Sequence, residues 1–334
     1  MIGSRADFLG AATAALFTGG LDVWSTPAPA TRIRILVSAD RGADTPQPFD
    51  AQTFTFGGTR YRGAPAIVRL PDGREAVIAN LDVDTYLYGV VGLEASPGWP
   101  AAALEAQSIV ARTYALEHRT LSRPYDVTMT ESDQRYGGIP AESPACVAAV
   151  DATRAIRLAY AGGPASVFYA SCCGGHTEDA ADLWGHAELP YVRGVVCRTC
   201  TASPDFRWER AIPLARISAL LGPRLGGAIT GFALGPADRS GRPRSIDVLA
   251  GGTTLTLATA AFRALLGADV IRSTWIRRIE IDSTQAVAQA VIEGSGRGHG
   301  VGLCQWGARG MSVAGASVAQ ILAYYFPGTV LARG

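Results

Sequence analysis

Residues 81–118 read LDVDTYLYGVVGLEASPGWPAAALEAQSIVARTYALEH, and this stretch decides the fold. Asp84 is expected to cap a first helix, because its carboxylate can accept hydrogen bonds from the amides of the first turn. Apolar residues spaced three and four apart then follow. A second helix is predicted from Pro100 at its first position, where the missing N–H loses no partner, to about Glu117. The stretch therefore predicts two helices around a short hinge.

Glu94 lies in the hinge, at the end of the first helix and next to Pro97 and Gly98. A carboxylate that ends a hydrophobic helix is poorly placed for a solvated charge. Burial there would raise its pKa, because removal from water disfavours the ionised form. Glu94 is therefore a candidate general acid. The alternative is a partly exposed glutamate at a helix C-terminus.

Three segments carry a resemblance to a known family. They are LDVDTYLYGVVGLEASPGWPAAALEAQSIVARTYAL (81–116), FYASCCGGHTEDAADLWG (168–185) and GRGHGVGLCQWGARGMSVAGASVAQILAYYFPGT (296–329). In this order they resemble the stage II sporulation protein D family, which also contains the amidase-enhancer (LytB-like) proteins. The resemblance implies a cell-wall protein. The best-known members act as lytic transglycosylases on peptidoglycan strands whose stem peptides have been removed.

The second helix offers three candidate sugar-binding residues. Gln107 and Tyr114 share a helical face by their spacing, and Arg112 is set off to one side. Arg112 would bind a sugar hydroxyl or hold Glu94. Its alternative role is a surface salt bridge with Glu105 or Glu117.

Four more candidates for binding the substrate lie outside the helical pair. Gln134 and Tyr136 belong to a polar, glycine-containing loop, where an amide can bind hydroxyls and a ring can stack on a sugar. They match a Q-x-Y-G element of the family that the chain resembles. His299 lies in a glycine-rich turn and is the second ionisable candidate; its alternative role is that of a hydrogen-bonded structural histidine. Gln305 is expected in the first turn of the helix that follows.

The cysteines suggest either a metal site or disulfides. Cys173 and His176 form a C-x-x-H pattern, and Cys197 and Cys200 form a C-x-x-C about twenty residues later, a spacing compatible with a four-coordinate structural zinc. Exported proteins more often use cysteines in disulfides, and free thiols are the third alternative. Zinc here would hold the loop in place and take no part in the chemistry.

Composition and the first residues bear on location and partners. Charged residues make up 18% of the 334 residues and the net charge is +1, which does not suggest a nucleic-acid partner. Residues 1–30 resemble an export signal with Arg5, an apolar run of about ten residues and Ala28-Pro29-Ala30 as the cleavage site. The run is too short to span a bilayer, and no other stretch qualifies. We expect an exported protein of the cell wall or the extracellular space.

The sequence predicts a mixed α+β fold. We expect an export signal (1–30), a core region in two parts (31–205 and 296–334) and an α/β subdomain inserted between them (206–295). The resemblance implies cleavage of the MurNAc–GlcNAc bond of glycan strands with a 1,6-anhydro product, using Glu94 and no cofactor in the chemistry. The alternatives are a non-catalytic enhancer of a cell-wall amidase and a glycan-binding module with neither activity.

Overall fold

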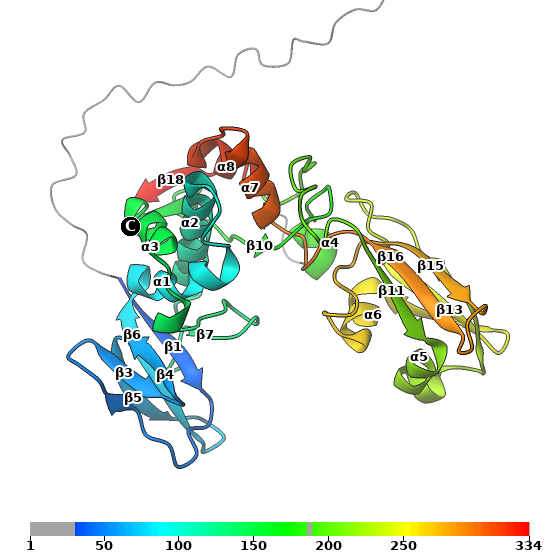
Figure 1. Ribbon diagram of the computed structural model, residues 1–334, viewed down its shortest axis with the longest axis horizontal. Helices are drawn as coiled ribbons and strands as arrows, with labels where there is room; N and C mark the ends of the chain where they lie inside the picture. Colours follow the sequence, from blue (N-terminus) through cyan, green and yellow to red (C-terminus); the bar gives the residue numbers. More distant parts are fainter. Residues whose placement is uncertain (1–30, 186–188, 334) are drawn as a thin grey trace, which may run out of the picture.

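The computed structural model describes residues 31–185 and 189–333 and shows the mixed α+β fold that was predicted. Residues 1–30, and with them the expected export signal, lie outside the described residues. Figure 1 shows a lobe built from the first part of the chain and its C-terminal end, and a second lobe built from residues 208–294. Among the helices that the structure describes, none is both long enough and apolar enough to cross a bilayer.

Two small sheets form the N-terminal layer. The strand order of the larger sheet is β5–β6–β1–β7, and that of the smaller is β2–β3–β4. In β1 every second side chain is buried, as the alternating sequence predicts. The turn between Phe56 and Thr59 has positive φ at both Gly57 and Gly58, as a tight hairpin turn requires. The strands are β1 (Arg32–Ser38), β2 (Gln47–Pro48), β3 (Thr53–Phe56), β4 (Thr59–Arg62), β5 (Ala64–Arg69), β6 (Glu75–Asp82) and β7 (Val127–Thr128).

The predicted helical pair is present, with different caps. Helix α1 (Val83–Glu94) is capped by Asp82, whose carboxylate accepts from the amides of Asp84 and Thr85. The prediction that Asp84 caps this helix was therefore wrong. Helix α2 spans Ala101–Glu117, and Pro100 is its cap and not its first helical residue. A short 3-10 turn η2 (Ile139–Ala141) and helix α3 (Pro144–Ala152), capped by Ser143, complete this part.

Helix α2 lies between two hydrophobic cores. Leu104 and Ala111 belong to the core shared with the N-terminal sheet and α1, and Ile109 and Val110 belong to the core shared with the C-terminal helices. Most of the helix is therefore buried around its circumference, which explains its alanine-rich sequence. Glu94 and the hinge precede this central helix directly.

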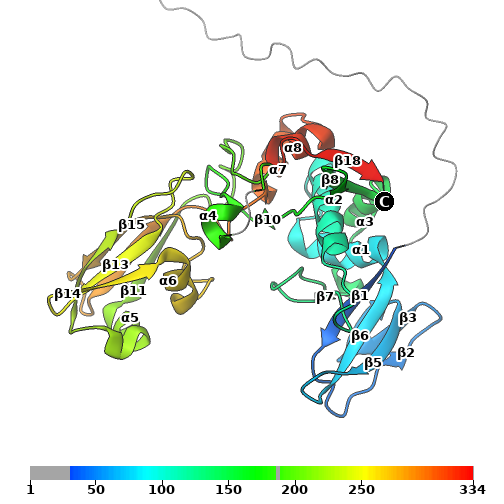
Figure 2. The ribbon, with the colours of Figure 1, turned by 180° about the vertical axis from the view of Figure 1, so that it is seen from behind.

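The second core joins residues far apart in the chain. Strand β10 (Tyr169–Ala170) pairs in parallel with β17 (Leu303–Cys304), so the glycine-rich segment lies beside the cysteine loop. Figures 1 and 2 both show the C-terminal helices beside α2. The remaining elements of this lobe are β8 (Ile156–Tyr160), β9 (Gly163–Pro164), α4 (Ala180–Trp184), α7 (Gln305–Val313), α8 (Val318–Tyr325) and β18 (Val330–Arg333).

The second lobe has its own core, formed by buried residues between Trp208 and Ile292. It contains two antiparallel sheets, ordered β11–β16–β15 and β12–β13–β14. Strands β11 and β16 were not predicted. The elements are β11 (Trp208–Pro213), α5 (Leu214–Leu221), η3 (Gly222–Arg224), β12 (Ile229–Leu234), β13 (Ser245–Ala250), β14 (Thr253–Ala258), α6 (Thr259–Leu266), β15 (Ile276–Asp282) and β16 (Gln289–Gly294).

A buried ion pair connects the second lobe to the cysteine loop. Nε of Arg242 lies 3.4 Å from Oε2 of Glu178, and both side chains are 2% exposed. Nη2 of Arg242 also donates to the carbonyl oxygens of Cys173 and His176. Burial raises the pKa of Glu178 to about 7 against the opposing attraction of Arg242. The contact between Arg242 and Glu178 therefore joins the two lobes at a place shielded from water.

Candidate active site around Glu94

Glu94 is the last residue of α1, and the chain leaves the helix directly after it. Ala95 is extended and donates its N–H to the carbonyl of Val91, which closes the last turn. A further turn joins Ser96 to Trp99 before α2 begins. Pro97 cannot donate the hydrogen bond that would continue the helix, so the sequence itself ends α1 at the acid.

Three polar groups approach the Glu94 carboxylate. Nε2 of Gln305, in the first turn of α7, donates to Oε2 at 3.3 Å. The backbone N–H of Arg135 donates to the same carboxylate, and the Arg135 guanidinium attracts its charge. Burial nevertheless dominates and raises the pKa of Glu94 above its ordinary value, while the hydrogen bonds from Gln305 and Arg135 oppose the rise. A carboxyl in this setting can hold a proton and yet be stabilised once it has released it.

Gln107 and Gln305 meet beside the acid. Nε2 of Gln305 lies 3.5 Å from Oε1 of Gln107, so one amide faces both Glu94 and α2. Gln107 is 1% exposed, and its own Nε2 has no hydrogen-bond partner among the described residues. An unpaired buried donor is unfavourable unless a ligand or a water accepts from it. Gln107, predicted from the helical face, is thus brought to the acid with a free donor.

Gln134 is buried and holds residues that surround the site. Its amide donates to the carbonyl of Ala111 and to the hydroxyl of Tyr169, and its carbonyl accepts from the hydroxyl of Tyr86. Gln134 is 1% exposed. Burial raises the pKa of both tyrosines, and the charge of Glu94 adds to the rise. The structure therefore gives Gln134 a supporting position in place of an open sugar-binding position.

Tyr136 and Tyr114 are also engaged within the protein. Tyr136 is 2% exposed and packs against Tyr86, with ring centroids 5.1 Å apart. Tyr114 stacks on His118 at 3.8 Å, and its hydroxyl lies 3.5 Å from Oδ1 of Asp133. The ring of Tyr136 is covered, whereas that of Tyr114 is partly exposed. Stacking of Tyr136 on a sugar, as the loop pattern predicted, does not fit this packing.

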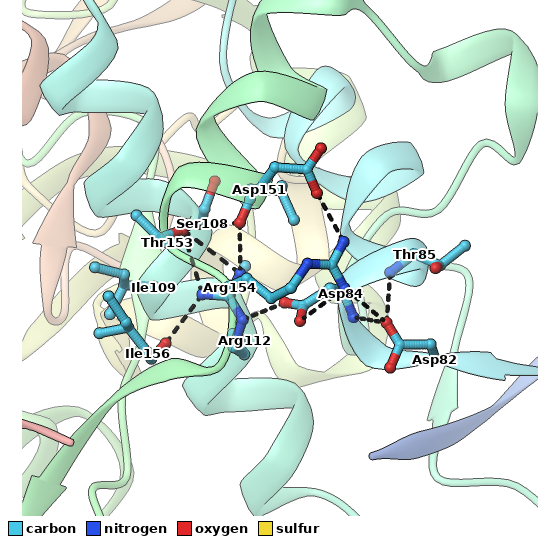
Figure 3. A network of polar contacts seen from close by, with 12 residues as sticks. Asp82, Asp84, Thr85, Ser108, Ile109, Arg112, Asp151, Thr153, Arg154 and Ile156 are labelled. Atoms are coloured by element: carbon cyan, nitrogen blue, oxygen red, sulfur yellow. Dashed lines mark hydrogen bonds and ion pairs between the residues drawn. The ribbon is translucent and has the colours of Figure 1, made fainter. Parts of the chain in front are cut away.

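Arg112 lies in a buried polar network and not at the acid. Figure 3 shows its guanidinium between Asp84, Thr153 and Ile156. Nε lies 2.5 Å from Oδ1 of Asp84, and the Arg112 side chain is 0% exposed. A side chain without exposure has no donor left for a sugar. Both expected roles fail, because the partner is neither Glu94 nor the surface acids Glu105 and Glu117.

His299 is held by backbone groups on both sides of its ring. Nε2 lies 2.8 Å from the carbonyl of Tyr169, and Nδ1 accepts from the N–H of Val301. Burial lowers the pKa of His299 to about 4, so the ring is neutral at neutral pH. Trp184 packs beside the ring at 5.2 Å. This is the arrangement of a structural histidine, the alternative that the sequence left open.

The cysteine loop forms a cluster that differs from the predicted one. The sulfur atoms of Cys173, Cys197, Cys200 and Cys304 all lie within 4.8 Å of one another, and all four residues are buried. Cys304 thus occupies the fourth position that was predicted for His176. Nδ1 of His176 instead lies 2.6 Å from the carbonyl oxygen of Thr177. The four thiols carry no disulfide, and four sulfur donors without an open position match a structural zinc site.

Sequence reasoning missed three features of the site. Arg135 faces Glu94 from the loop, and its only signal was a position between Gln134 and Tyr136. Trp99 and Trp306 pack edge to face at 5.3 Å, which joins the hinge to α7. Cys304 joins a cluster whose other members precede it by more than 100 residues, so no local spacing could have revealed it.

Two hollows on the surface of the described residues are not lined by Glu94. One, of about 420 Å³, is lined by Arg32, Arg34 and Asp126 among others; the second, of about 460 Å³, lies around Trp208 and Glu293. Neither is lined by Glu94, Gln107 or Gln305. The candidate site is therefore defined by burial and hydrogen bonding.

The sequence of this chain is similar to those of a known family and of several bacterial proteins. A family described as stage II sporulation protein matches residues 71–160, which include Glu94 and both helices of the pair. An uncharacterized protein of Brachyspira hyodysenteriae is 30% identical over 82% of this chain and 73% of its own length. The amidase enhancer of Bacillus subtilis is 26% identical over 73% of this chain but only 40% of its own length. Stage II sporulation protein D of Bacillus amyloliquefaciens is 25% identical over 75% of this chain and 74% of its own.

Proposed function

This chain belongs to the stage II sporulation protein D family, and on that premise we propose that it is an exported lytic transglycosylase that cleaves the MurNAc–GlcNAc bond of peptidoglycan. The observation that carries the proposal is Glu94, a partly buried carboxyl with a raised pKa and a hydrogen bond from Gln305. A protein that only binds glycan has no need for such a group.

The proposed reaction uses one carboxyl twice. Protonated Glu94 donates to the oxygen that joins C1 of MurNAc to C4 of GlcNAc, and the C1–O bond breaks. The resulting carboxylate then accepts the proton of the MurNAc C6 hydroxyl as that oxygen bonds to C1. The product is a 1,6-anhydro ring, no water is consumed, and Glu94 ends in its starting state. Ordinary hydrolysis would require a second carboxyl to act as nucleophile or to activate water.

The neighbours of Glu94 fit the two halves of this cycle. Burial favours the proton-bearing form that starts the reaction, and the N–H groups of Gln305 and Arg135 stabilise the carboxylate that forms midway. Gln107 is buried beside the acid and would support the amide of Gln305, which lies 3.5 Å from its Oε1. Gln134, Tyr136 and His299 would act indirectly, by keeping the tyrosines and the strand beside the acid in place.

To test this proposal, the purified protein is incubated with glycan strands that lack stem peptides. A parallel reaction contains intact peptidoglycan. Mass spectrometry should detect new 1,6-anhydro ends. Glu94→Gln should lower the rate by at least about 10²- to 10⁴-fold, the usual contribution of a positioned proton donor. Glu105→Gln, a partly buried carboxyl on α2, is the matched control and should retain activity. Equal rates for Glu94→Gln and the parent would refute the mechanism.

The resemblance to the amidase enhancer of Bacillus subtilis supports a second candidate, stimulation of a cell-wall amidase without catalysis. In that case the protein would accelerate an added N-acetylmuramoyl amidase on intact peptidoglycan, and Glu94→Gln would do so equally well. No anhydro ends would form. Binding to glycan without either effect would instead indicate a glycan-binding module.

A further inference from the structure

The distances within the cysteine cluster distinguish a metal site from disulfides. The sulfur atoms of Cys173 and Cys200 are 3.7 Å apart. A disulfide requires about 2.05 Å. Four sulfurs around a tetrahedral zinc, each roughly 2.3 Å from the ion, lie roughly 3.8 Å from one another. The separation of Cys173 and Cys200 matches one edge of that tetrahedron, and the other sulfur pairs lie within 4.8 Å.

The surroundings of the cluster suit thiolates. The sulfur of Cys304 accepts from the backbone N–H of Cys173 at 3.2 Å and from that of Gly307 at 3.3 Å. The hydroxyl of Tyr325 lies 3.1 Å from the sulfur of Cys197. Such hydrogen bonds stabilise negative sulfur and orient metal ligands. All four cysteines are at most 1% exposed, so an ion bound here would be closed off from solvent.

Cys304 links this cluster to Glu94. It caps α7, and the next residue, Gln305, donates to Glu94 and approaches Gln107. Trp306 follows and packs against Trp99 in the hinge. Three consecutive residues therefore connect the sulfur cluster, the acid and the hinge.

We propose that Cys173, Cys197, Cys200 and Cys304 bind one Zn²⁺, and that the ion holds the start of α7 so that Gln305 reaches Glu94. The ion has a structural role, because four protein ligands leave no position for substrate. The metal-binding part stands independently of the enzymatic activity. The position of α7 can also be measured without any substrate. Only the effect of that position on catalysis rests on the proposed function.

The first experiment measures metal content. Protein expressed with added zinc should contain one zinc per chain by inductively coupled plasma mass spectrometry, and Cys304→Ser should lose it. Cys146→Ser is the matched control, because Cys146 is equally buried but lies in α3 outside the cluster. Cobalt substitution should give the absorption bands of a tetrahedral thiolate site. A zinc-free protein, or a thiol titration that shows the four cysteines oxidised to two disulfides, would overturn the proposal.

The second experiment measures the position of α7. Hydrogen–deuterium exchange of residues 305–313 should accelerate at least about tenfold when zinc is removed by a chelator, and should slow again when zinc is restored. The β12–β13–β14 sheet serves as an internal control for folding and should not change. Unchanged protection of α7 without zinc would disprove the positioning role. Because neither measurement uses glycan, failure of the glycan-cleavage assay would leave both results interpretable.

Discussion

The amide of Gln305 donates a hydrogen bond of 3.3 Å to the carboxylate of Glu94 across 211 residues of sequence. This contact joins the end of α1 to the start of α7, and it opposes the effect of burial on the acid. Burial is the larger effect on the pKa of Glu94, and the hydrogen bond from Gln305 acts against it.

Gln305→Leu should therefore shift the pH dependence of glycan cleavage. The donated hydrogen bond stabilises the carboxylate and lowers the pKa of Glu94, so its loss should raise that pKa further. Because the reaction starts from the protonated acid, the fall in kcat/KM at high pH should move to higher pH. This shift is measured by a pH–rate profile in which the formation of anhydro ends is the readout. Gln52→Leu, in an exposed loop, should keep the parent profile, and an unshifted profile for Gln305→Leu would show that the contact does not reach the reacting state.

Arg112→Leu should destabilise the protein strongly. It removes the buried partner of Asp84 and leaves that carboxylate only its longer contact with Arg154, and breaking a buried pair from one side typically costs about 3–5 kcal/mol. Arg74→Leu is the control, because Arg74 and its partner Asp72 are both about half exposed and lie outside this network, so that loss of their pair should change the stability little. Urea unfolding monitored by circular dichroism gives both values. A stable Arg112→Leu protein that no longer binds glycan would instead restore the sugar-contact role predicted from sequence.

Glu178 should make the stability depend on pH. Its pKa is raised to about 7 in the folded protein, so the fold favours the protonated form. The stabilisation is complete below the ordinary pKa of about 4.5 and is lost as the pH rises through about 7, a change on the order of 3 kcal/mol. The unfolding free energy of the parent should thus fall relative to that of Glu178→Gln from about pH 4.5 to about pH 8.

The control for this prediction is Asp182→Asn, which removes a partly exposed partner of Arg244 close to Glu178 in sequence. Its unfolding free energy should run parallel to that of the parent over the same pH range. A parent and a Glu178→Gln protein with parallel curves would mean that Glu178 ionises normally in the fold.

Gly307→Ala should disturb the cysteine cluster from the opposite side. A Cβ at this position would lie 2.0 Å from the hydroxyl of Tyr325 and 2.6 Å from the sulfur of Cys197, closer than atoms pack. We expect a lower melting temperature and reduced zinc content. Val313→Ala, at an exposed site of the same helix, should change neither. Full zinc content and an unchanged melting temperature for Gly307→Ala would show that α7 can move away without consequence.

Local patterns in the sequence predicted most of the first lobe. The alternation in β1, the paired glycines of the β3–β4 turn and the Ser317 cap of α8 are each specified by neighbouring residues, and all are present. Strands β11 and β16 escaped prediction because their short segments carry no clear period of two. Asp82 and Asp84 lie two residues apart and both can cap a helix, so the sequence did not distinguish them.

The site was only partly predictable for a related reason. Glu94 was found because its local setting, a hydrophobic helix followed by Pro and Gly, already implies burial. The position of Arg112 on a helix says which residues share its face but not that the face is buried beneath Thr153 and Ile156. Likewise the choice of Cys304 over His176 depends on the pairing of β10 with β17, a contact between segments 131 residues or more apart.

The parallel pairing of β10 with β17 has a consequence for the order in which the protein matures. Ribosomes make the chain from its N-terminus, so Glu94 and the helical pair exist long before Gln305 has been synthesised. A chain interrupted between α1 and α7 would contain the acid but not its amide partner. The synthesis of α7 therefore decides when the candidate site around Glu94 is assembled.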